Sequence, residues 1–546
     1  MLLVGINSKF THSNLAIRYM VKCDSRFSFR EFSIADRPET IARELFSTDA
    51  RVFLFSCYIW NIETVLKVAE ILKKADPGFF ICLGGPEVSF RAEGILEENP
   101  FLDAVLTGEA EMVITPFGDA VATGDFSLVP GLYLRRGESV VKNLLPAKET
   151  AMEDLPFPYD ETELSALSNR IVYYETSRGC PYRCAFCLSG AAGSLRFMDT
   201  DRVARELTLF ENNKVPLVKF IDRTFNADPR RALSIIEGIK ERDGETCYHF
   251  EIRAETMTNE LINALKTAKK GLFQLEIGVQ STNPEVLCAI GRTPDFERLS
   301  EVVSSLSENK NLHLHLDLIA GLPGENMESF LRSFHQVIAF RPDNLQLGFL
   351  KKLSGSSLMA PESEFASFPP YEIVKSDKMS HRDLLRLKRA EEMLERYYNS
   401  GAYPTAVPYL LDTFFAGREF TFFEELAEFL AGDLSPKSLK TQFEELYRFA
   451  YPFAGETFRE KLTYDYARTH RDTLSFMKKG DYLKEQAFAF LKEPQCVAQY
   501  FTDYAGEKPA VLYKKIRFVP IGTRIIAFDD EKGRVEDVTK EFELEE

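Results

Sequence analysis

Short apolar runs alternate with amphipathic helical stretches over the first 110 residues of the chain. The runs begin at Leu2, Phe27, Val52, Phe79 and Asp103, and each is followed by a polar turn and a stretch with helical spacing. Continuous apolar runs separated by helices are typical of parallel strands that are covered on both faces. The pattern therefore predicts an open, doubly wound α/β sheet over residues 1–143.

A second series of strand-like runs occupies residues 166–370. Its members start near Ile171, Val215, Cys247, Gly271, Leu312 and Leu345, with helical stretches between them. Such alternation favours a partial or full β/α barrel, in which the chemistry lies at the carboxyl ends of the strands. The preceding segment, residues 144–165, contains three prolines and no clear period, which predicts a linker.

The pattern changes again over residues 371–546, where helical stretches are rich in Tyr and Phe. Residues 383–398 and 438–449 are the clearest helices, and strands are expected over 511–519 and 524–538. We expect a mainly helical domain with a terminal β portion. Aromatic residues at helical spacing indicate a packed core more readily than a stacking platform.

The composition and net charge of the chain exclude several classes of protein. The chain has 546 residues, 45% hydrophobic and 27% charged, which is ordinary globular usage. A net charge of -16 disfavours nonspecific binding to nucleic acid, which depends on Lys and Arg. The sequence shows no apolar run long enough to span a membrane, no leader pattern at its start and no disulfide framework. We expect a cytoplasmic protein.

Three of the nine cysteines crowd together directly after a predicted strand. Cys180, Cys184 and Cys187 form a C-x3-C-x2-C pattern. Three thiolates from one loop suit a [4Fe-4S] cluster with one open iron, which could chelate an amine and a carboxylate. The competing interpretation is a zinc site that lacks its fourth ligand, but no second C-x2-C pair or downstream His pair accompanies the pattern.

This cysteine spacing, with an aromatic residue before the last Cys, resembles the radical S-adenosylmethionine (SAM) superfamily. The resemblance implies that Cys180, Cys184 and Cys187 hold the cluster and that SAM binds the open iron and is cleaved reductively to a 5'-deoxyadenosyl radical. It also implies SAM contacts, which we place at Phe186, Asp222, Arg253, Glu276, Gln280, Ser281, Ala320, Gly321, Leu322 and Pro323.

Some of these SAM contacts have competing interpretations. Asp222 stands where the family usually has two glycines and a glutamate, and could accept a hydrogen bond from the SAM amino group. Arg253 could pair with the SAM carboxylate, or form an ion pair with Glu251 or Glu255. A structural ion pair is also the competing interpretation for Glu276.

An α/β sheet before such a barrel resembles the cobalamin-binding subgroup, whose N-terminal domain is flavodoxin-like. Ligands of open α/β sheets lie at the carboxyl ends of the strands, and the loops at those ends resemble the corrin contacts of the subgroup. The expected cobalamin residues are Asn7, His12, Ser13, Asn14, Ser56, Cys57, Tyr58, Ile59, Trp60, Gly84, Gly85, Pro86, Glu87, Thr107, Gly108 and Glu109.

The motif D-x-H-x-x-G, whose His ligates cobalt in many methyltransferases, is absent from the sequence. His12 is the only histidine before residue 249, and its position favours capping or lining a helix start over ligating cobalt. We therefore expect cobalamin to bind without a protein histidine on cobalt.

The resemblance implies a cobalamin-dependent radical SAM enzyme, most often one that methylates an unactivated carbon or phosphorus centre. Non-methylating rearrangement, cyclisation or cleavage is the alternative. Expected partners are a small-molecule or modified-nucleoside substrate and an electron donor such as flavodoxin or ferredoxin. Substrate identity does not follow from the sequence.

Two further alternatives stay open. A tRNA methylthiotransferase would hold a second cluster, for which Cys23, Cys57 and Cys82 are the candidates, but an Asn-Thr pair before the middle Cys is replaced by Phe55-Ser56. A cobalamin or redox sensor without turnover is the other. The remaining cysteines, Cys247, Cys288 and Cys496, have no partner pattern and are expected to be small buried residues.

Overall fold

The computed structural model describes residues 1–542, apart from Lys148, Ala192, Asp243, Gly432, Leu434 and residues 479–482. Two compact units make up the chain. The first comprises residues 1–342 and 347–384, and the second comprises residues 343–346 and 385–546. Within the described residues, no helix is both long and apolar enough to cross a membrane.

The first sheet has seven strands in the order β2-β1-β3-β4-β5-β6-β7. The parallel strands are β1 (Leu2–Asn7), β2 (Ser28–Ser33), β3 (Val52–Ser56), β4 (Phe80–Gly84) and β5 (Ala104–Leu106). They confirm the doubly wound sheet. Strands β6 (Leu132–Arg136) and β7 (Ser139–Lys142) extend it antiparallel; the sequence analysis did not predict them.

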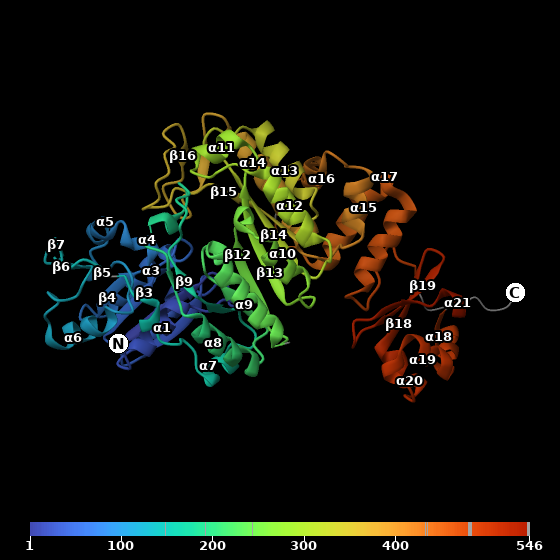
Figure 1. Ribbon diagram of the computed structural model, residues 1–546, viewed down its shortest axis with the longest axis horizontal. Coiled ribbons are helices and arrows are strands. Elements are labelled where there is room, and N and C mark those ends of the chain that lie inside the picture. The colour runs from blue at the N-terminus through green and yellow to red at the C-terminus, as the bar shows by residue number, and fades with distance from the viewer. Residues whose placement is uncertain are drawn as a thin grey trace. The chain divides into compact units, whose positions relative to one another are not determined.

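Helices cover both faces of this sheet, as the blue part of Figure 1 shows. They are α1 (Leu15–Cys23), α2 (Pro38–Phe46), α3 (Ile62–Ala75), α4 (Pro86–Ser89), α5 (Ala92–Glu98) and α6 (Ile114–Thr123). Alternate residues of β1 enter two different cores. Leu2, Val4 and Ile6 pack in one and Leu3 in the other, which explains why the strand is apolar throughout.

The second large sheet has six strands in the order β15-β14-β13-β12-β11-β8. These are β8 (Val172–Tyr174), β11 (Leu217–Phe220), β12 (Cys247–Ile252), β13 (Phe273–Gln280), β14 (His313–Ala320) and β15 (Asn344–Phe349). The pairs from β8 to β14 are parallel. The sheet stays open within the described residues, so the structure confirms the partial barrel and not the full one.

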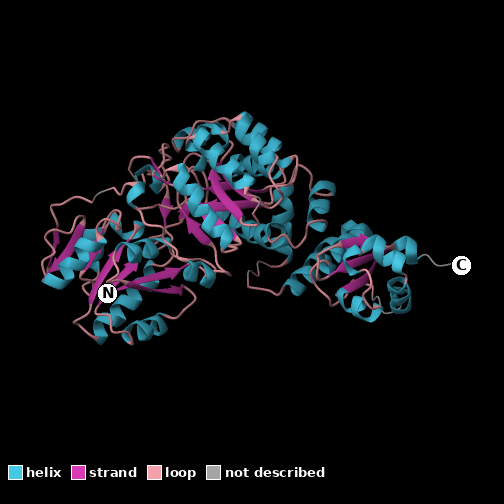
Figure 2. Ribbon diagram, turned by 60° about the horizontal axis from the view of Figure 1, so that its bottom comes forward, coloured by secondary structure: helices cyan, strands magenta, loops and turns pink. Residues whose placement is uncertain are grey.

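Residues of this open barrel alternate between its two faces. Every second residue of β13 is buried, and the residues between them are half-buried. The helices of this region are α7 (Glu161–Ala166), α8 (Thr200–Asn212), α9 (Pro229–Glu241), α10 (Asn259–Lys266), α11 (Pro284–Ala289), α12 (Phe296–Ser307) and α13 (Met327–Ile338). Figure 2 shows the strands in magenta beside these helices in cyan.

Two short antiparallel pairs complete the first unit. Strands β9 (Ser177–Arg178) and β10 (Arg196–Phe197) frame the segment that carries the clustered cysteines. Strands β16 (Glu364–Phe365) and β17 (Ile373–Lys375) form the other pair.

The C-terminal region is mainly helical, as expected. Its α-helices are α14 (His381–Leu394), α15 (Ala406–Thr413), α16 (Glu419–Phe429), α17 (Leu439–Ala467), α18 (Lys484–Lys492), α19 (Pro494–Tyr500), α20 (Pro509–Lys515) and α21 (Thr539–Phe542). Buried aromatic side chains, including Tyr397, Phe443 and Tyr466, form its core.

Three antiparallel strands close this region: β18 (Ile516–Ile521), β19 (Arg524–Asp529) and β20 (Val535–Asp537). The strand expected over 511–519 starts later than predicted, because residues 509–515 form α20 with Pro509 in its first turn. Proline is favoured at the start of a helix, where its missing N–H costs nothing.

Candidate functional site

The clustered cysteines lie on the loop that follows β8 and β9. The thiols of Cys180, Cys184 and Cys187 are all partly exposed and line one cavity of about 180 Å³, which we call the cysteine cavity. Gly179 precedes the first Cys with a φ of 85°, and a Cβ there would lie 2.4 Å from the carbonyl oxygen of Ser194. The turn into the loop therefore requires glycine.

Asp222 binds the segment that leads into this loop and does not line the cysteine cavity. Its buried carboxylate accepts hydrogen bonds from the backbone N–H groups of Thr176 and Ser177 and from the Thr176 hydroxyl. Burial raises the pKa of Asp222 despite these donors. The carboxylate of Asp222 therefore already has structural contacts, and the hydrogen bond from the SAM amino group that it could accept stays a prediction.

Four of the residues expected to contact SAM do line the cysteine cavity: Phe186, Arg253, Glu276 and Gln280. The guanidinium of Arg253 lies 4.0 Å from the ring centre of Tyr182. Its Nε is also 3.2 Å from Glu255, so the ion pair considered for Arg253 forms with Glu255 and not with Glu251.

The other expected SAM contacts lie outside the residues that line the cavity. Ser281 donates a hydrogen bond to Glu325 over 2.7 Å. In the segment Ala320, Gly321, Leu322 and Pro323, the first and third residues are fully buried, and a Cβ on Gly321 would meet Ile373 of β17 at 2.9 Å. Residues 320–323 therefore pack against neighbouring parts of the first unit, including β17, and do not line the cysteine cavity.

The inner face of the open barrel carries charged groups beside the cavity. Glu276 on β13 lies 3.0 Å from His249 and 3.1 Å from Lys219. Burial alone would raise its pKa, but the His249 hydrogen bond and the charges of Lys219 and His315 lower the pKa of Glu276 to about 2. The ion pair considered for Glu276 is therefore present.

Glu251 and Asp317 complete the acidic part of the cysteine cavity. Burial raises the pKa of Glu251 to about 7, and burial also raises the pKa of Asp317, which lies 2.9 Å from His315. Neither residue was expected in the cavity from the sequence, and the same holds for Tyr182, Arg223 and Arg292. Charged residues at alternate positions of otherwise apolar strands were the available signal.

A second cavity, of about 220 Å³, lies at the carboxyl ends of β3, β4 and β5 and beside α1. We call it the N-terminal cavity. Its walls include seven of the residues expected to contact cobalamin: Ser56, Tyr58, Gly84, Gly85, Pro86, Gly108 and Glu109. Gly85 has a φ of 110°, and a Cβ there would lie 2.5 Å from the carbonyl oxygen of Cys57, so the close approach requires glycine.

The other expected cobalamin residues have contacts of their own. Asn14 caps α1, Ser13 donates to the Ile171 carbonyl, Asn7 donates to Glu31, Thr107 donates to the Gly131 carbonyl, and Glu87 accepts from Tyr371. Cys57 is fully buried, while Trp60 is exposed and stacks on Tyr58. Ile59 is half-buried.

His12 contacts the barrel rather than a helix start. Its Nδ1 lies 2.7 Å from the hydroxyl of Tyr173 on β8. Burial lowers the pKa of His12, and the positive charges of Lys9 and Lys219 lower it further.

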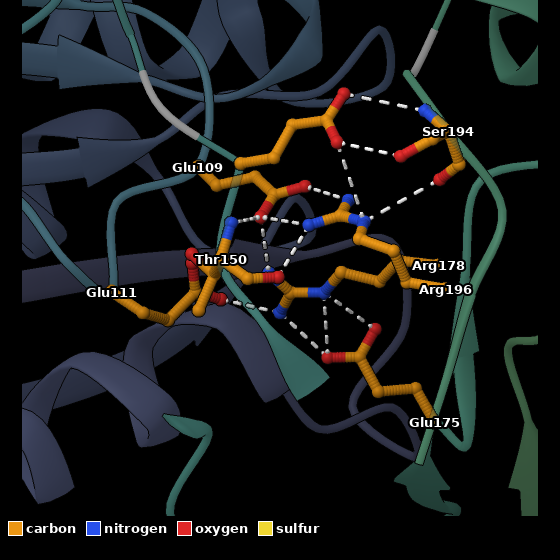
Figure 3. A network of polar contacts seen from close by, with 8 residues as sticks. Glu109, Glu111, Thr150, Glu175, Arg178, Ser194 and Arg196 are labelled. Carbon is orange, nitrogen blue, oxygen red and sulfur yellow. Dashed lines mark hydrogen bonds and ion pairs between the residues drawn. The ribbon is translucent and has the colours of Figure 1, made fainter. Parts of the chain in front are cut away.

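An ion-pair network joins the N-terminal cavity to the cysteine loop (Figure 3). Arg178, two residues before Cys180, lies 3.1 Å from Glu109, 2.5 Å from Glu111 and 2.6 Å from Glu175. Arg196 pairs with Glu109 as well. Burial alone would raise the pKa of Glu109, but hydrogen bonds from Arg196 and the Thr150 N–H, with the charge of Arg178, lower it to about 2.

The three cysteines considered for a second cluster, Cys23, Cys57 and Cys82, do not lie in one common environment. Cys57 belongs to one core of the N-terminal sheet and Cys82 to the other, and burial raises the pKa of both thiols. Cys23 packs at the edge of the core that contains Cys82.

Among the described residues, no group of three or more His, Cys, Asp or Glu side chains is arranged to hold a single metal ion. A [4Fe-4S] cluster requires a different arrangement of ligands, because each cysteine thiolate binds a different iron atom. The thiols of Cys180, Cys184 and Cys187, which line one cavity, fit this arrangement.

Family models match three parts of the chain. The B12 binding domain matches residues 2–115, the radical SAM superfamily matches residues 174–337, and a protein family of unknown function, DUF4080, matches residues 362–540. The chain therefore combines a B12-binding domain with a radical SAM domain, which confirms the resemblance to the cobalamin-binding radical SAM family. Cobalamin, SAM and a [4Fe-4S] cluster are the cofactors of these two domains.

Individual relatives are similar over part of their length. The cobalamin-dependent radical SAM methyltransferase TokK of Streptomyces tokunonensis is 29% identical over 333 residues, which cover 57% of this chain and 48% of TokK. The 2-(S-pantetheinyl)-carbapenam-3-carboxylate methyltransferase of Streptantibioticus cattleyicolor is 29% identical over 304 residues, 52% of this chain and 44% of that protein. The chain thus matches about half the length of these curated relatives.

Solved structures share the fold. The cobalamin-dependent SAM radical enzyme OxsB aligns with a TM-score of 0.58 at 14% identity, covering 85% of this chain and 78% of OxsB. The radical SAM methyltransferase TsrM from Kitasatospora setae aligns with a TM-score of 0.56 at 15% identity, covering 68% of this chain and 78% of TsrM.

Proposed function

We propose that this chain is a cobalamin-dependent radical SAM methyltransferase that methylates an unactivated carbon or phosphorus centre of a small molecule. The observation that carries the proposal is the cysteine cavity, which three thiols at radical SAM spacing line together. When bound, the cluster and SAM supply radical chemistry and the corrin supplies a transferable methyl group.

The residues that line the cysteine cavity would hold the cluster and orient SAM. Cys180, Cys184 and Cys187 would hold the cluster. Burial raises the pKa of the Cys184 thiol, while the nearby Arg292 lowers it, so a positive charge beside the loop favours the thiolate that binds iron. Arg253, on the same cavity, offers a guanidinium for the SAM carboxylate.

The N-terminal cavity would hold part of the corrin cofactor. Its walls are mainly apolar, with Leu54, Leu83 and Leu106 among them, and Gly84 and Gly85 leave room for a bulky group. Because His12 already contacts Tyr173, binding without a protein histidine on cobalt remains the proposal.

Methylation is favoured over other outcomes by the two methyltransferases that match about half of this chain. A reduced flavodoxin or ferredoxin is the proposed electron donor. The second candidate is a radical reaction without methylation, which one relative favours: an anaerobic magnesium-protoporphyrin IX monomethyl ester cyclase of Rubrivivax gelatinosus, 22% identical over 349 residues.

The other two alternatives are less well supported. A threonylcarbamoyladenosine tRNA methylthiotransferase of Pyrococcus horikoshii is 27% identical over 281 residues. However, Cys57 and Cys82 lie in different cores, which disfavours a second cluster. A sensor without turnover would not require the charged side chains that line the cysteine cavity.

The proposal is tested by anaerobic reconstitution of the full chain and its triple variant, in which Cys180, Cys184 and Cys187 are replaced by Ala. We expect about four iron atoms per wild-type chain and almost none in the variant. With reductant, cobalamin, SAM and the substrate that donates the hydrogen atom and accepts the methyl group, the wild-type chain should release both 5'-deoxyadenosine and S-adenosylhomocysteine. Deoxyadenosine alone would favour the second candidate, and full iron content in the triple variant would refute the cluster site.

A further inference from the structure

Thr224 lies within hydrogen-bond distance of Cys180, the first of the three clustered cysteines. Its hydroxyl oxygen, Oγ1, is 3.5 Å from Sγ of Cys180, and both residues line the cysteine cavity. The same hydroxyl donates to the backbone carbonyl of Arg223 over 2.8 Å. Thr224 is only 7% exposed. A buried hydroxyl therefore faces the sulfur that would bind iron.

The segment that carries Thr224 is fixed on both sides. Asp222 accepts hydrogen bonds from two N–H groups of the segment that leads into the cysteine loop. Asn226 accepts from the N–H of Arg253 over 2.9 Å and donates to the carbonyl of the same residue over 2.8 Å. Because these bonds tie the segment to the cysteine loop and to the end of β12, they hold the Thr224 hydroxyl close to Cys180.

The number of hydrogens available decides the direction of each bond. A hydroxyl has a single hydrogen. While Cys180 is a thiol, the hydrogen of Thr224 points to the Arg223 carbonyl and the thiol donates to Oγ1. A cysteine that binds iron is a thiolate and has no hydrogen to donate. The Thr224 hydroxyl then becomes the donor to Cys180, because a hydrogen bond to an ionised acceptor is stronger than one to a carbonyl.

The other two cysteines have partners of a different kind. Sγ of Cys187 accepts from the backbone N–H of Ser189 over 3.4 Å, and Cys184 lies near the positive charge of Arg292. Substitution of Ser189 would leave its N–H in place, and substitution of Arg292 would remove a charge from the cavity. At Thr224, by contrast, a nearly isosteric change removes the donor and alters no charge.

We propose that the Thr224 hydroxyl donates a hydrogen bond to the Cys180 thiolate of the [4Fe-4S] cluster and thereby raises the reduction potential of the cluster. The inference rests on the proposed function, because it requires a cluster on these cysteines. Reduction adds one electron, and a hydrogen bond to a ligating sulfur stabilises the more negative, reduced form. The electron comes from dithionite in the test and from the proposed flavodoxin or ferredoxin otherwise. Thr224 is a positioning residue, since it acts through Cys180.

The test measures the midpoint potential of the cluster in the full, anaerobically reconstituted chain without SAM. Each sample is titrated with dithionite in the presence of redox mediators, and the reduced cluster is followed by electron paramagnetic resonance. Thr224→Val keeps the shape of the side chain and loses the donor, so the ratio of reduced to oxidised cluster at a given potential should fall about tenfold. For a one-electron couple, this is a shift of about 59 mV to more negative potential.

Two variants serve as controls. Thr224→Ser keeps the hydroxyl and should stay close to the wild-type potential. Thr208→Val should match wild type as well, because Thr208 is exposed on α8 and its hydroxyl donates to the Ala204 carbonyl. An unchanged potential in Thr224→Val, or equal shifts in Thr224→Val and Thr224→Ser, would overturn the inference and leave the proposed function standing.

Iron content and circular dichroism melting check that each variant folds and holds a cluster, and Thr224→Ala provides a second variant without the hydroxyl. It should shift the potential in the same direction as Thr224→Val. If neither Thr224→Val nor Thr224→Ala holds a cluster, the hydroxyl anchors the loop instead of setting the potential, and the inference is wrong. A wild-type chain that holds no cluster would overturn both the inference and the proposed function.

Discussion

Two glutamates of the open barrel show how burial alone can set the state of a carboxyl group. Glu251 lines the cysteine cavity. Glu325 lies on the loop between β14 and α13, where its Oε1 accepts hydrogen bonds from Ser281 and Ser329. Burial raises the pKa of each to about 7. Glu276 shows the opposite outcome, because it accepts a hydrogen bond from His249 and lies beside the positive charges of Lys219 and His315.

The raised pKa of Glu325 predicts a pH-dependent stability that Glu325→Gln removes. A carboxyl with a higher pKa in the folded chain holds its proton more tightly there, so its contribution favours folding below about pH 4.5 and is lost as pH rises to about 7. The shift corresponds to about 3 kcal/mol. Between pH 5 and pH 8, wild type should lose more stability than Glu325→Gln by up to this amount.

Urea unfolding of the cluster-free chain, followed by circular dichroism at both pH values, measures the difference. Glu251 titrates in both proteins and cancels from the comparison. The control is Glu328→Gln in the first turn of α13, which begins shortly after Glu325. The Glu328 side chain is 83% exposed and pairs with Arg332, so this variant should keep the wild-type pH dependence. Parallel losses in wild type and Glu325→Gln would contradict the assignment.

At the scale of elements, sequence patterns predict buried strands better than exposed ones. Four parallel strands of the first sheet, β1, β3, β4 and β5, are evident from apolar runs, because both of their faces are buried. The edge strand β2 is mostly exposed or half-buried. Strands β6 and β7 could not be predicted in this way. Strand β7 is mostly exposed, and it is held by its pairing with β6 and by Val140, which packs against one core of the sheet. At the C-terminal region, Pro509 starts a helix where an apolar run alone indicated a strand.

The cysteine loop is an element whose shape depends on one backbone position. Gly179 adopts a left-handed conformation, and Ser194 leaves no space for a Cβ. Gly179→Ala should therefore displace the loop and reduce the iron bound after anaerobic reconstitution from about four atoms per chain to less than half of that. Iron is measured by colorimetric assay against protein concentration.

Gly94→Ala serves as the control, because Gly94 lies within α5 and a Cβ there would have the flexible end of Glu98 as its neighbour at 4.0 Å. Its iron content should equal that of wild type. Full iron loading of Gly179→Ala would show that the loop tolerates a Cβ.

At the scale of the whole first unit, the contacts that join its two sheets come from residues far apart in the sequence. Glu109 binds Arg178 and Arg196, which are 69 and 87 positions away. The C-x3-C-x2-C spacing predicts the cysteine cavity because its members share one loop. No local spacing predicts the Glu109 network, since its partners meet only after both sheets have formed.

Glu109 also fixes the segment between the two sheets. Its carboxylate accepts a hydrogen bond from the Thr150 N–H over 2.6 Å, and Arg196 donates to the Thr150 carbonyl. Glu109→Gln replaces a charged acceptor by an amide that cannot match two guanidinium groups, at a cost of about 1.4 kcal/mol. Local opening around Thr150 should then become about tenfold more frequent.

Limited digestion with thermolysin under native conditions, with fragments identified by mass spectrometry, measures this opening. Cleavage between residues 144 and 165 should be about tenfold faster in Glu109→Gln, because proteolysis follows the population of the open form when closing is fast. Glu98→Gln is the control, since its side chain is 59% exposed and pairs with Arg91 within the N-terminal sheet region. Equal cleavage rates in wild type and Glu109→Gln would mean that the packing of the two sheets, and not this network, holds the segment in place.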